Sequence, residues 1–380
     1  MTAHNLTKPR LPSHYYVWSE PPDSSGDEVL HFVSERRRIK LKGQSFREFE
    51  QRVVPLLDGR HTIAEIGEQV SDVFSRRDLE AALDLLATQN LLEDVDFGGL
   101  NGSSHLEPQL NFFHEAGLKP AETQQRLRKA TATVFGLSGA GAGVAQALAA
   151  AGVGTVRCLD SLAVSSSDLY LCPLFSPSDV GAVRTDVVAR SLETAAPMVK
   201  VQSVNHLLVS DDDVLAAVEG SSFVACCLDQ GQSALIYKLN RACLRAGIPW
   251  SSCALSGSEV IVGPTIDPFE TACYLCYKMR VVACAGNPED SFAFEKLLDR
   301  RKQDDNGRRE NLVFGAAIAA NLLALEVVRE IAGLTPVPTR GRIVVFDLLE
   351  MKSTKHVVLR KPWCPACFRS GQTSTQEQSA

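Results

Sequence analysis

The sequence predicts an α/β protein in which a small winged-helix domain precedes a doubly wound, mostly parallel sheet with an antiparallel C-terminal extension. Three observations lead to this prediction. Within the first hundred residues, strand-like segments come before three short helical segments. From about residue 117, strands alternate with helices, which is typical of a parallel sheet. The last strand-like segments have no helices between them, which indicates antiparallel pairing.

Length and composition set the broad class. The 380 residues suffice for two or three domains, and 45% hydrophobic with 22% charged residues is ordinary for a soluble protein. The net charge of −6 offers no general attraction for nucleic acid or anionic membrane, so neither is expected as a partner. No apolar stretch is long enough to span a bilayer, and the N-terminus lacks the apolar core of a signal peptide. We therefore expect a cytoplasmic protein.

The winged-helix domain is expected over residues 1–95. The segments "HYYVWSEP", "EVLHFVS" and "RRRIKLKG" have the apolar or alternating patterns of strands. The patterns "SFRE", "TIAE" and "SRRD" each place a hydroxyl three residues before a carboxylate, as a capping box does. They predict helices over residues 46–57, 63–72 and 76–89. A short strand at "LLEDV" completes the domain.

A linker is expected over residues 96–116, where "DFGGLNGSSHLEPQ" has glycine, serine and proline and little periodicity. The sheet domain follows over residues 117–370. Its strands are expected at "ATATVF", "VRCLD", "VKVQSVNHLLV", "SSFVACCLD", "IPWSSCAL", "GSEVIVGPTI", "RIVVFDLL" and "KHVVLR". The polar residues 371–380 are predicted to be a disordered tail.

The stretch "GLSGAG" lies between a predicted strand and a predicted helix, where glycines let backbone N–H groups approach a phosphate. Its candidate residues are Gly136, Ser138, Gly139 and Gly141. Asp160, about twenty residues later, stands where an acid would hold a ribose, and Asp229 ends another predicted strand. The alternative is that the glycines serve strand–helix packing and the aspartates only end strands or cap helices.

Two C-x-x-C pairs predict a structural zinc site. They are Cys273 with Cys276 and Cys364 with Cys367. Four thiolates can surround zinc tetrahedrally and leave no position for water. Redox use of one pair is the alternative. A further cysteine, Cys284, precedes a charged stretch and is a weaker candidate for an exposed nucleophile, with an incidental role as the alternative.

The order of these features resembles the ThiF/HesA/MoeB superfamily over about residues 117–368. It comprises the glycine loop, "AAAGVGTVRCLD", a strand ending in Asp229, a C-x-x-C pair, the helix "FGAAIAANLLALEVVREIAG" and a second C-x-x-C pair. The resemblance implies an ATP-binding fold whose members adenylate the C-terminal carboxylate of a protein or peptide. Members are often dimers, so a homodimer is expected here.

The chain departs from the family pattern at charged positions. Ser138 replaces the second glycine of the loop, Leu162 replaces the second acid after Asp160, and "DLYL" has Asp168 for the family's asparagine and Leu171 for its arginine. Arg184 stands where the family has a lysine. Adenylation develops negative charge between phosphates, so losing cations removes transition-state stabilisation. We therefore predict a degenerate site without catalytic residues that does not use ATP. If it does adenylate, Asp229 and Arg184 would take part.

The N-terminal domain resembles a RiPP recognition element, the module with which cyclodehydratase partner proteins bind leader peptides of azole-containing, ribosomally made peptides. The resemblance implies that a leader adds as a strand beside the third strand and packs on the third helix. Here these would be residues 37–42 and 76–86. The candidate contacts are Arg38, Lys40, Leu79 and Leu83. A solvated strand face and ordinary core spacing are the alternative explanations of these residues.

In such systems a separate YcaO-type subunit performs the ATP-dependent cyclodehydration at cysteine, serine or threonine. The resemblance therefore implies a leader peptide and a YcaO subunit as partners. Two other functions remain open. One is an active adenylating enzyme acting on a peptide or sulfur-carrier C-terminus. The other is a DNA-binding regulator, against which the net charge and the short, acid-flanked third helix argue.

Overall fold

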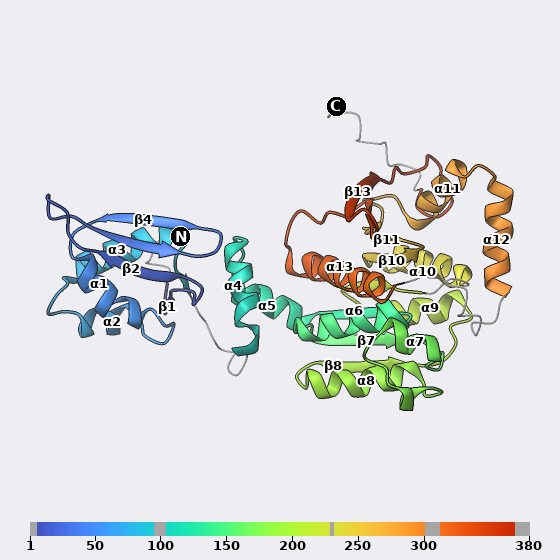
Figure 1. Cartoon of the computed structure of the whole chain (residues 1–380), viewed down its shortest axis with the longest axis horizontal. Coiled ribbons are helices and arrows are strands. Elements are labelled where there is room, and N and C mark those ends of the chain that lie inside the picture. The colour runs from blue at the N-terminus through green and yellow to red at the C-terminus, as the bar shows by residue number, and fades with distance from the viewer. Residues whose placement is uncertain (1–5, 95–103, 229–231, 301–311, 369–380) are drawn as a thin grey trace. The chain divides into compact units, whose positions relative to one another are not determined.

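The computed structural model describes residues 6–94, 104–228, 232–300 and 312–368 of the chain (Figure 1). The chain divides into two compact units, Met1–Gln125 and Arg126–Ala380. The helix α5 (Pro120–Lys129) contains the boundary. Each unit has its own hydrophobic core and is described separately below.

The first unit contains a three-stranded antiparallel sheet followed by three helices (Figure 1). The strands pair in the order β2 (Tyr16–Glu20), β3 (Glu28–Val33) and β4 (Arg38–Gly43). The helical segments are α1 (Phe46–Arg52), the 3-10 turn η2 (Val54–Leu56), α2 (Ile63–Gln69) and α3 (Arg76–Thr88). The short strands β1 (Pro9–Arg10) and β5 (Glu93–Asp94) pair with each other. Apart from β1, which the sequence analysis did not predict, this element order is the predicted one, and the winged-helix assignment stays a prediction.

The helix starts of the first unit differ in how they are capped. Thr62 and Glu65 form the full capping box that the sequence predicts. The Ser75 hydroxyl accepts a hydrogen bond from the Asp78 amide, which caps α3. The prediction for Ser45 is wrong, because this residue has a left-handed backbone with a φ of 58° and makes no side-chain cap.

The expected linker over residues 96–116 is helical in its second half. The 3-10 turn η3 (Ser104–Leu106) and the helix α4 (Glu107–Glu115) occupy it, and residues 95–103 lie outside the described residues. Leu110 and Phe113 of α4 are buried, and Glu107 bonds to Arg10 and to Ser13. Proline in the first turn and apolar residues three apart stabilise a helix here in spite of the glycine and serine before it.

The second unit is built on one eight-stranded sheet in the order β13-β12-β11-β10-β9-β6-β7-β8. Its strands are β6 (Thr131–Phe135), β7 (Thr155–Leu159), β8 (Lys200–Val204), β9 (Phe223–Cys226), β10 (Trp250–Ser256), β11 (Glu259–Val262), β12 (Arg342–Asp347) and β13 (Lys352–Val357). The neighbouring strands β8, β7, β6, β9 and β10 pair in parallel. The neighbouring strands β10, β11, β12 and β13 pair antiparallel. The predicted mostly parallel α/β sheet is confirmed.

Helices connect and cover this sheet (Figure 1). They are α6 (Gly139–Ala150), α7 (Ser166–Leu171), α8 (Arg184–Ala195), α9 (Asp211–Val218), α10 (Ser233–Ala246), α11 (Tyr274–Cys284), α12 (Pro288–Arg300) and α13 (Val313–Ala332), with the 3-10 turn η4 (Pro177–Asp179) before α8. The helix α13 packs against α6 and β10. Small residues on α6 and α13 allow this close approach: a Cβ on Gly143 would lie 2.8 Å from Cβ of Ala320.

The strand order positions the candidate site. The chain runs outward from β6 through β7 and β8 on one side and through β9 and β10 on the other. Ligands of doubly wound sheets bind where the order reverses, at the carboxyl ends of the strands. The glycine loop after β6 and Asp160 after β7 both lie at this end.

Candidate functional site

The glycine loop is a tightly packed turn between β6 and α6. Gly136 has a φ of 79°, and a Cβ on it would lie 2.7 Å from the carbonyl oxygen of Cys227. A Cβ on Gly141 would lie 1.7 Å from the carbonyl oxygen of Gly136. Real side chains do not tolerate such contacts with backbone. Both glycines are therefore required by the turn itself, whether or not a nucleotide binds.

Ser138 fits the turn without strain. It is the N-cap residue of α6, with an extended backbone at a φ of −74° and a ψ of 162°. Its side chain is buried, and its carbonyl oxygen accepts a hydrogen bond from the Gly141 amide at 2.8 Å. Replacing the family's glycine with serine thus preserves the turn. Whether the loop can bind a phosphate then depends on the charged residues around it.

Three charged residues at the carboxyl end of β7 form what we call the aspartate–arginine triad: Asp160, Asp168 and Arg184. The Arg184 Nη2 donates to both carboxylate oxygens of Asp168, at 3.0 and 2.9 Å, and its Nε donates to Oδ2 at 3.1 Å. The Nη1 donates to Oδ2 of Asp160 at 3.2 Å. All three side chains are at most 6% exposed. One guanidinium therefore serves two buried carboxylates.

Asp160 is further occupied by the loop. Its Oδ2 accepts a hydrogen bond from the amide of Leu137 at 2.8 Å, and its Oδ1 accepts one from the amide of Leu162 at 2.9 Å. Burial raises the pKa of Asp160, while the positive charge of Arg184 and these hydrogen bonds oppose the rise. Both oxygens of the carboxylate predicted to hold a ribose thus contribute to holding the protein together.

Asp168 is a site residue whose partner the sequence analysis did not identify. Its carboxylate accepts hydrogen bonds from the amide and hydroxyl of Ser165, at 2.8 and 2.9 Å, and this caps α7. The same carboxylate then holds Arg184, sixteen residues later. The spacing of Ser165 and Asp168 is a capping-box pattern and could have predicted the helix start. No local pattern indicates the pairing with Arg184.

A cavity of about 790 Å³ lies beside the triad. It is lined by Gly136, Asp160 and Arg184, and Leu162 adds an apolar wall. Leu171, at the position of the family's arginine, packs on the loop, with its Cβ 3.0 Å from where a Cβ of Gly139 would lie. The space has the size of a small-ligand pocket, but a leucine stands where the family pattern has a cation.

The other basic side chains that line the cavity, among the described residues, are His206 and Lys238. The Nζ of Lys238 donates to the carbonyl oxygen of Val209. Arg184 and Lys238 therefore both have acceptors within the protein. The predicted site residue Asp229 lies outside the described residues.

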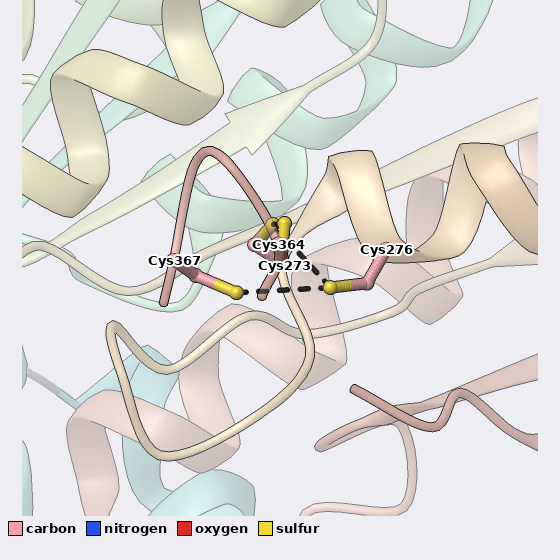
Figure 2. A group of neighbouring side chains, drawn as sticks. All are labelled: Cys273, Cys276, Cys364 and Cys367. Carbon is pink, nitrogen blue, oxygen red and sulfur yellow. Dashed lines mark hydrogen bonds between the residues drawn. The ribbon is translucent and has the colours of Figure 1, made fainter. Parts of the chain in front are cut away.

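Figure 2 shows the four predicted zinc ligands gathered in one place, and we call them the cysteine cluster. The Sγ atoms lie 3.9 Å apart for Cys273 and Cys276, 3.7 Å for Cys273 and Cys364, and 3.6 Å for Cys276 and Cys367. All four residues are buried. Tetrahedral zinc with bonds of about 2.3 Å places its sulfur ligands roughly 3.8 Å apart. The spacing therefore fits a structural metal ion.

The surroundings of the cysteine cluster favour a thiolate at one of its members. Hydrogen bonds from Cys273 and Cys367 lower the pKa of Cys276, whereas the pKa of Cys273 and of Cys367 is raised. The backbone amide of Lys361 also donates to Sγ of Cys276, at 3.3 Å. Amide hydrogen bonds to ligand sulfur are the second layer that orients a metal site. The cluster could bind zinc and would then tie the C-terminal segment to the start of α11.

The first unit presents a free strand edge at β4. Ser34 donates its amide to the carbonyl oxygen of Arg37, which closes the β3–β4 hairpin. Because antiparallel pairs alternate between bonded and non-bonded positions, this register turns the amides of Arg38, Lys40 and Lys42 away from β3. Among the described residues, no strand pairs with that side of β4. The outward amides and carbonyls form a template for an added strand.

The opposite edge of this sheet is partly blocked. The outward amide of Ser19 on β2 donates to the Glu50 carboxylate of α1 at 2.7 Å, and the Ser19 hydroxyl donates to the same oxygen at 2.5 Å. Helix α1 packs along β2 and β3. The two edges therefore differ, and β4 is the one available for pairing.

Two of the four predicted leader contacts lie inside the first unit. Leu79 and Leu83 are buried in the core of the first unit, 1% and 0% exposed, so ordinary core spacing explains them. Arg38 and Lys40 are exposed on the other face of the sheet, away from that core. Ile39 and Leu41 alternate with them and are only half-buried.

The described residues contain no helix long and apolar enough to cross a membrane.

The chain was compared with models of known protein families. The model of the ThiF family matches residues 106–366. The sulfur carrier protein adenylyltransferase of Thermus thermophilus is 27% identical over 279 residues, which are 71% of this chain and 94% of that protein. Molybdopterin-synthase adenylyltransferase of Escherichia coli is 25% identical over 248 residues, 64% of this chain and 89% of that protein.

Solved structures extend the likeness in fold to nearly the whole chain. The microcin C7 biosynthetic enzyme MccB in complex with N-formylated MccA has a TM-score of 0.68 at 19% identity, over 95% of this chain and 99% of that one. PaaA has a TM-score of 0.64 at 18% identity, over 92% of this chain and 99% of that one. With a family match over more than half of its length and the sheet order described above, this chain belongs to the ThiF family.

Proposed function

We propose that this protein binds the leader of a ribosomally made precursor peptide and presents the core of that peptide to a separate YcaO-type cyclodehydratase. The observation that carries the proposal is the free edge of β4 with its outward amides. An extended leader would pair with these amides and continue the sheet. The cysteine cluster would hold zinc and stabilise the second unit, and the chain would work as a homodimer in the cytoplasm.

Charge indicates which leader would fit. The outer face of β4 carries Arg38 and Lys40, whose side chains are exposed, whereas Lys42 is already paired with Asp23 and Asp27 at 3.1 and 3.3 Å. Side chains of an added strand alternate between the two faces. A leader with acidic residues at alternate positions would face Arg38 and Lys40. The intervening apolar residues would lie on the side of Ile39 and Leu41.

The state of the nucleotide-like site supports a recognition role for this chain. Adenylation needs free cations against the phosphates. Arg184 is held by two carboxylates, Lys238 by a carbonyl oxygen, and Leu171 replaces the family's arginine. Backbone packing requires Gly136 and Gly141 whether or not a nucleotide binds. The ATP chemistry would belong to the YcaO subunit.

The binding experiment separates backbone pairing from side-chain charge. The probe is a fluorescently labelled synthetic peptide with acidic residues at alternate positions and apolar residues between them, titrated with the full chain and followed by anisotropy. Lys40→Pro removes the outward amide and no β3–β4 hydrogen bond, because proline is tolerated where the amide faces solvent. We expect it to weaken binding by about tenfold or more, which is about 1.4 kcal/mol.

Lys40→Ala is the matched control and keeps the amide. It should lose only the contribution of one exposed charge. Equal binding by Lys40→Pro and the wild-type chain would refute strand addition at β4. Salt-sensitive binding of duplex DNA with no peptide binding would favour a DNA-binding regulator in its place.

An adenylating enzyme is the second candidate, because the relatives named above are adenylyltransferases and the cavity is large enough for a small ligand. ATP–pyrophosphate exchange with the precursor peptide, or with a sulfur-carrier protein, distinguishes the two functions. We expect no exchange above background. Robust exchange would establish adenylation and refute the recognition-only role.

A further inference from the structure

A second cluster of metal-ligating side chains lies in the first unit, far in sequence from the cysteines. His14 lies between β1 and β2, and His114 and Glu115 end α4. A ligand atom from each lies within 4.8 Å of the others. We propose that this histidine cluster (His14, His114 and Glu115) binds a divalent transition metal, with zinc as the expected ion.

Unpartnered nitrogens carry the argument. Both ring nitrogens of His114 and the Nδ1 of His14 are buried and have no hydrogen-bond partner. His114 is 3% exposed. A buried polar atom without a partner costs free energy, and such groups in native proteins usually mark a missing ligand, ion or water. Each ring can offer one nitrogen to an ion, so the two imidazoles and the Glu115 carboxylate form a set of three donors.

The chemistry of the donors fits zinc. Neutral imidazole nitrogens and a carboxylate oxygen are ligands that zinc takes at about 2.0 to 2.2 Å. Burial of the His114 side chain lowers the pKa of its imidazole. Three protein ligands would leave one position for water.

Neighbouring residues hold the carboxylate in place. Glu115 Oε1 lies 2.8 Å from His14 Nε2 and accepts a hydrogen bond from the Ser34 hydroxyl at 3.1 Å. The Tyr15 ring lies 4.4 Å from the His14 ring and 6.1 Å from the His114 ring. Outer groups of this kind orient the first ligands of metal sites.

The histidine cluster is partly accessible to solvent, and the nearby arginines are paired with other groups. The side chains of His14 and Glu115 are 17% and 8% exposed, which leaves a route for the metal from solvent. Arg10 and Arg37 are the nearby cations. Arg10 is paired with Glu93 and Glu107, and Arg37 donates to the carbonyl oxygens of Gln89 and Asn90. A bound metal would fasten α4 to the segment that precedes β2.

The test counts zinc in the full chain. Protein stripped with a chelator is reloaded with zinc and desalted, and metal is measured by elemental analysis. His114→Leu should lose one zinc equivalent relative to the wild-type chain, independently of the cysteine cluster. His61→Leu is the matched control, since His61 lies 3.0 Å from a carboxylate of Asp58 in the same unit but in no such cluster. It should keep the full zinc content.

Cobalt distinguishes the two sites spectroscopically. In a Cys364→Ser background, bound cobalt should give the spectrum of nitrogen and oxygen ligands, and His114→Leu should abolish it. Glu115→Gln keeps the shape of the carboxylate and decides the question if His114→Leu fails to fold. It should weaken zinc binding by about tenfold or more. Unchanged zinc binding in folded His114→Leu, or in Glu115→Gln, would overturn the proposal.

Discussion

Replacing Arg184 with leucine should strongly destabilise the second unit. The substitution removes the only guanidinium of the triad and leaves Asp168, whose side chain is 1% exposed, and Asp160, at 5%, without a positive partner. Removing one partner of a buried ion pair costs about 3–5 kcal/mol, because the remaining charge is buried and unpaired. If the guanidinium instead reached solvent or a ligand, its loss would have little effect on stability.

Urea unfolding measures the effect. With a slope near 3 kcal/mol/M, the expected loss lowers the unfolding midpoint of the second unit by about 1 M or more. Arg190→Leu is the matched control, because Arg190 is 68% exposed and pairs with Asp179 at 3.3 Å on the surface. Exposed pairs contribute little, so this midpoint should hardly move.

The stability loss caused by Arg184→Leu should depend on pH, and the pKa of Asp160 gives the direction of that dependence. Without Arg184, the folded-state pKa of Asp160, already raised by burial, rises further above its unfolded value. A group with a raised folded pKa favours the folded state below its unfolded pKa and loses that contribution as pH rises through the folded pKa. The difference in unfolding midpoint between Arg184→Leu and the wild-type chain should therefore become smaller as pH falls from 7 towards 4. A midpoint for Arg184→Leu equal to that of Arg190→Leu at pH 7 would refute the buried triad.

Two further perturbations test the loop and the cysteine cluster. Gly141→Ala should destabilise the second unit by about 3 kcal/mol or more, because its Cβ would overlap the Gly136 carbonyl oxygen, whereas Gly286→Ala, with open space around it, should be close to neutral in the same urea assay. Equal midpoints for these two variants would disprove the packing role of Gly141. Cys364→Ser should reduce the zinc content of the purified chain, whereas Cys284→Ser at an exposed cysteine should not. Zinc content unchanged by Cys364→Ser would contradict the four-thiolate site.

Patterns that act over a few residues were sufficient for much of the fold. The alternation of strands and helices predicts the mostly parallel sheet, because each element's hydrophobic period is set by its own geometry. The two C-x-x-C pairs predict the cysteine cluster, since each pair positions two sulfurs and a shared metal ion would need all four of them. The first-unit strands and helices follow in the same way.

Assignments that depend on which face of an element meets another were less secure. Leu79 and Leu83 lie on a predicted helix, and the same spacing serves a core or a binding surface. In the folded unit both leucines pack in the hydrophobic core. The expected linker contains α4, whose residues Leu110 and Phe113 are buried and whose Glu107 bonds to Arg10, far away in the sequence.

The sequence by itself determined most of the order of elements, the family of the sheet domain and the four residues of the cysteine cluster. Only the tertiary structure decided what holds Arg184, which edge of the small sheet is open, and that His14 meets His114 across a hundred residues of chain. The physical reason is the distance along the sequence over which each feature is set. Helix and strand patterns depend on neighbouring residues. Charge pairing, strand-edge exposure and metal ligation depend on atoms that approach one another only after the chain has folded.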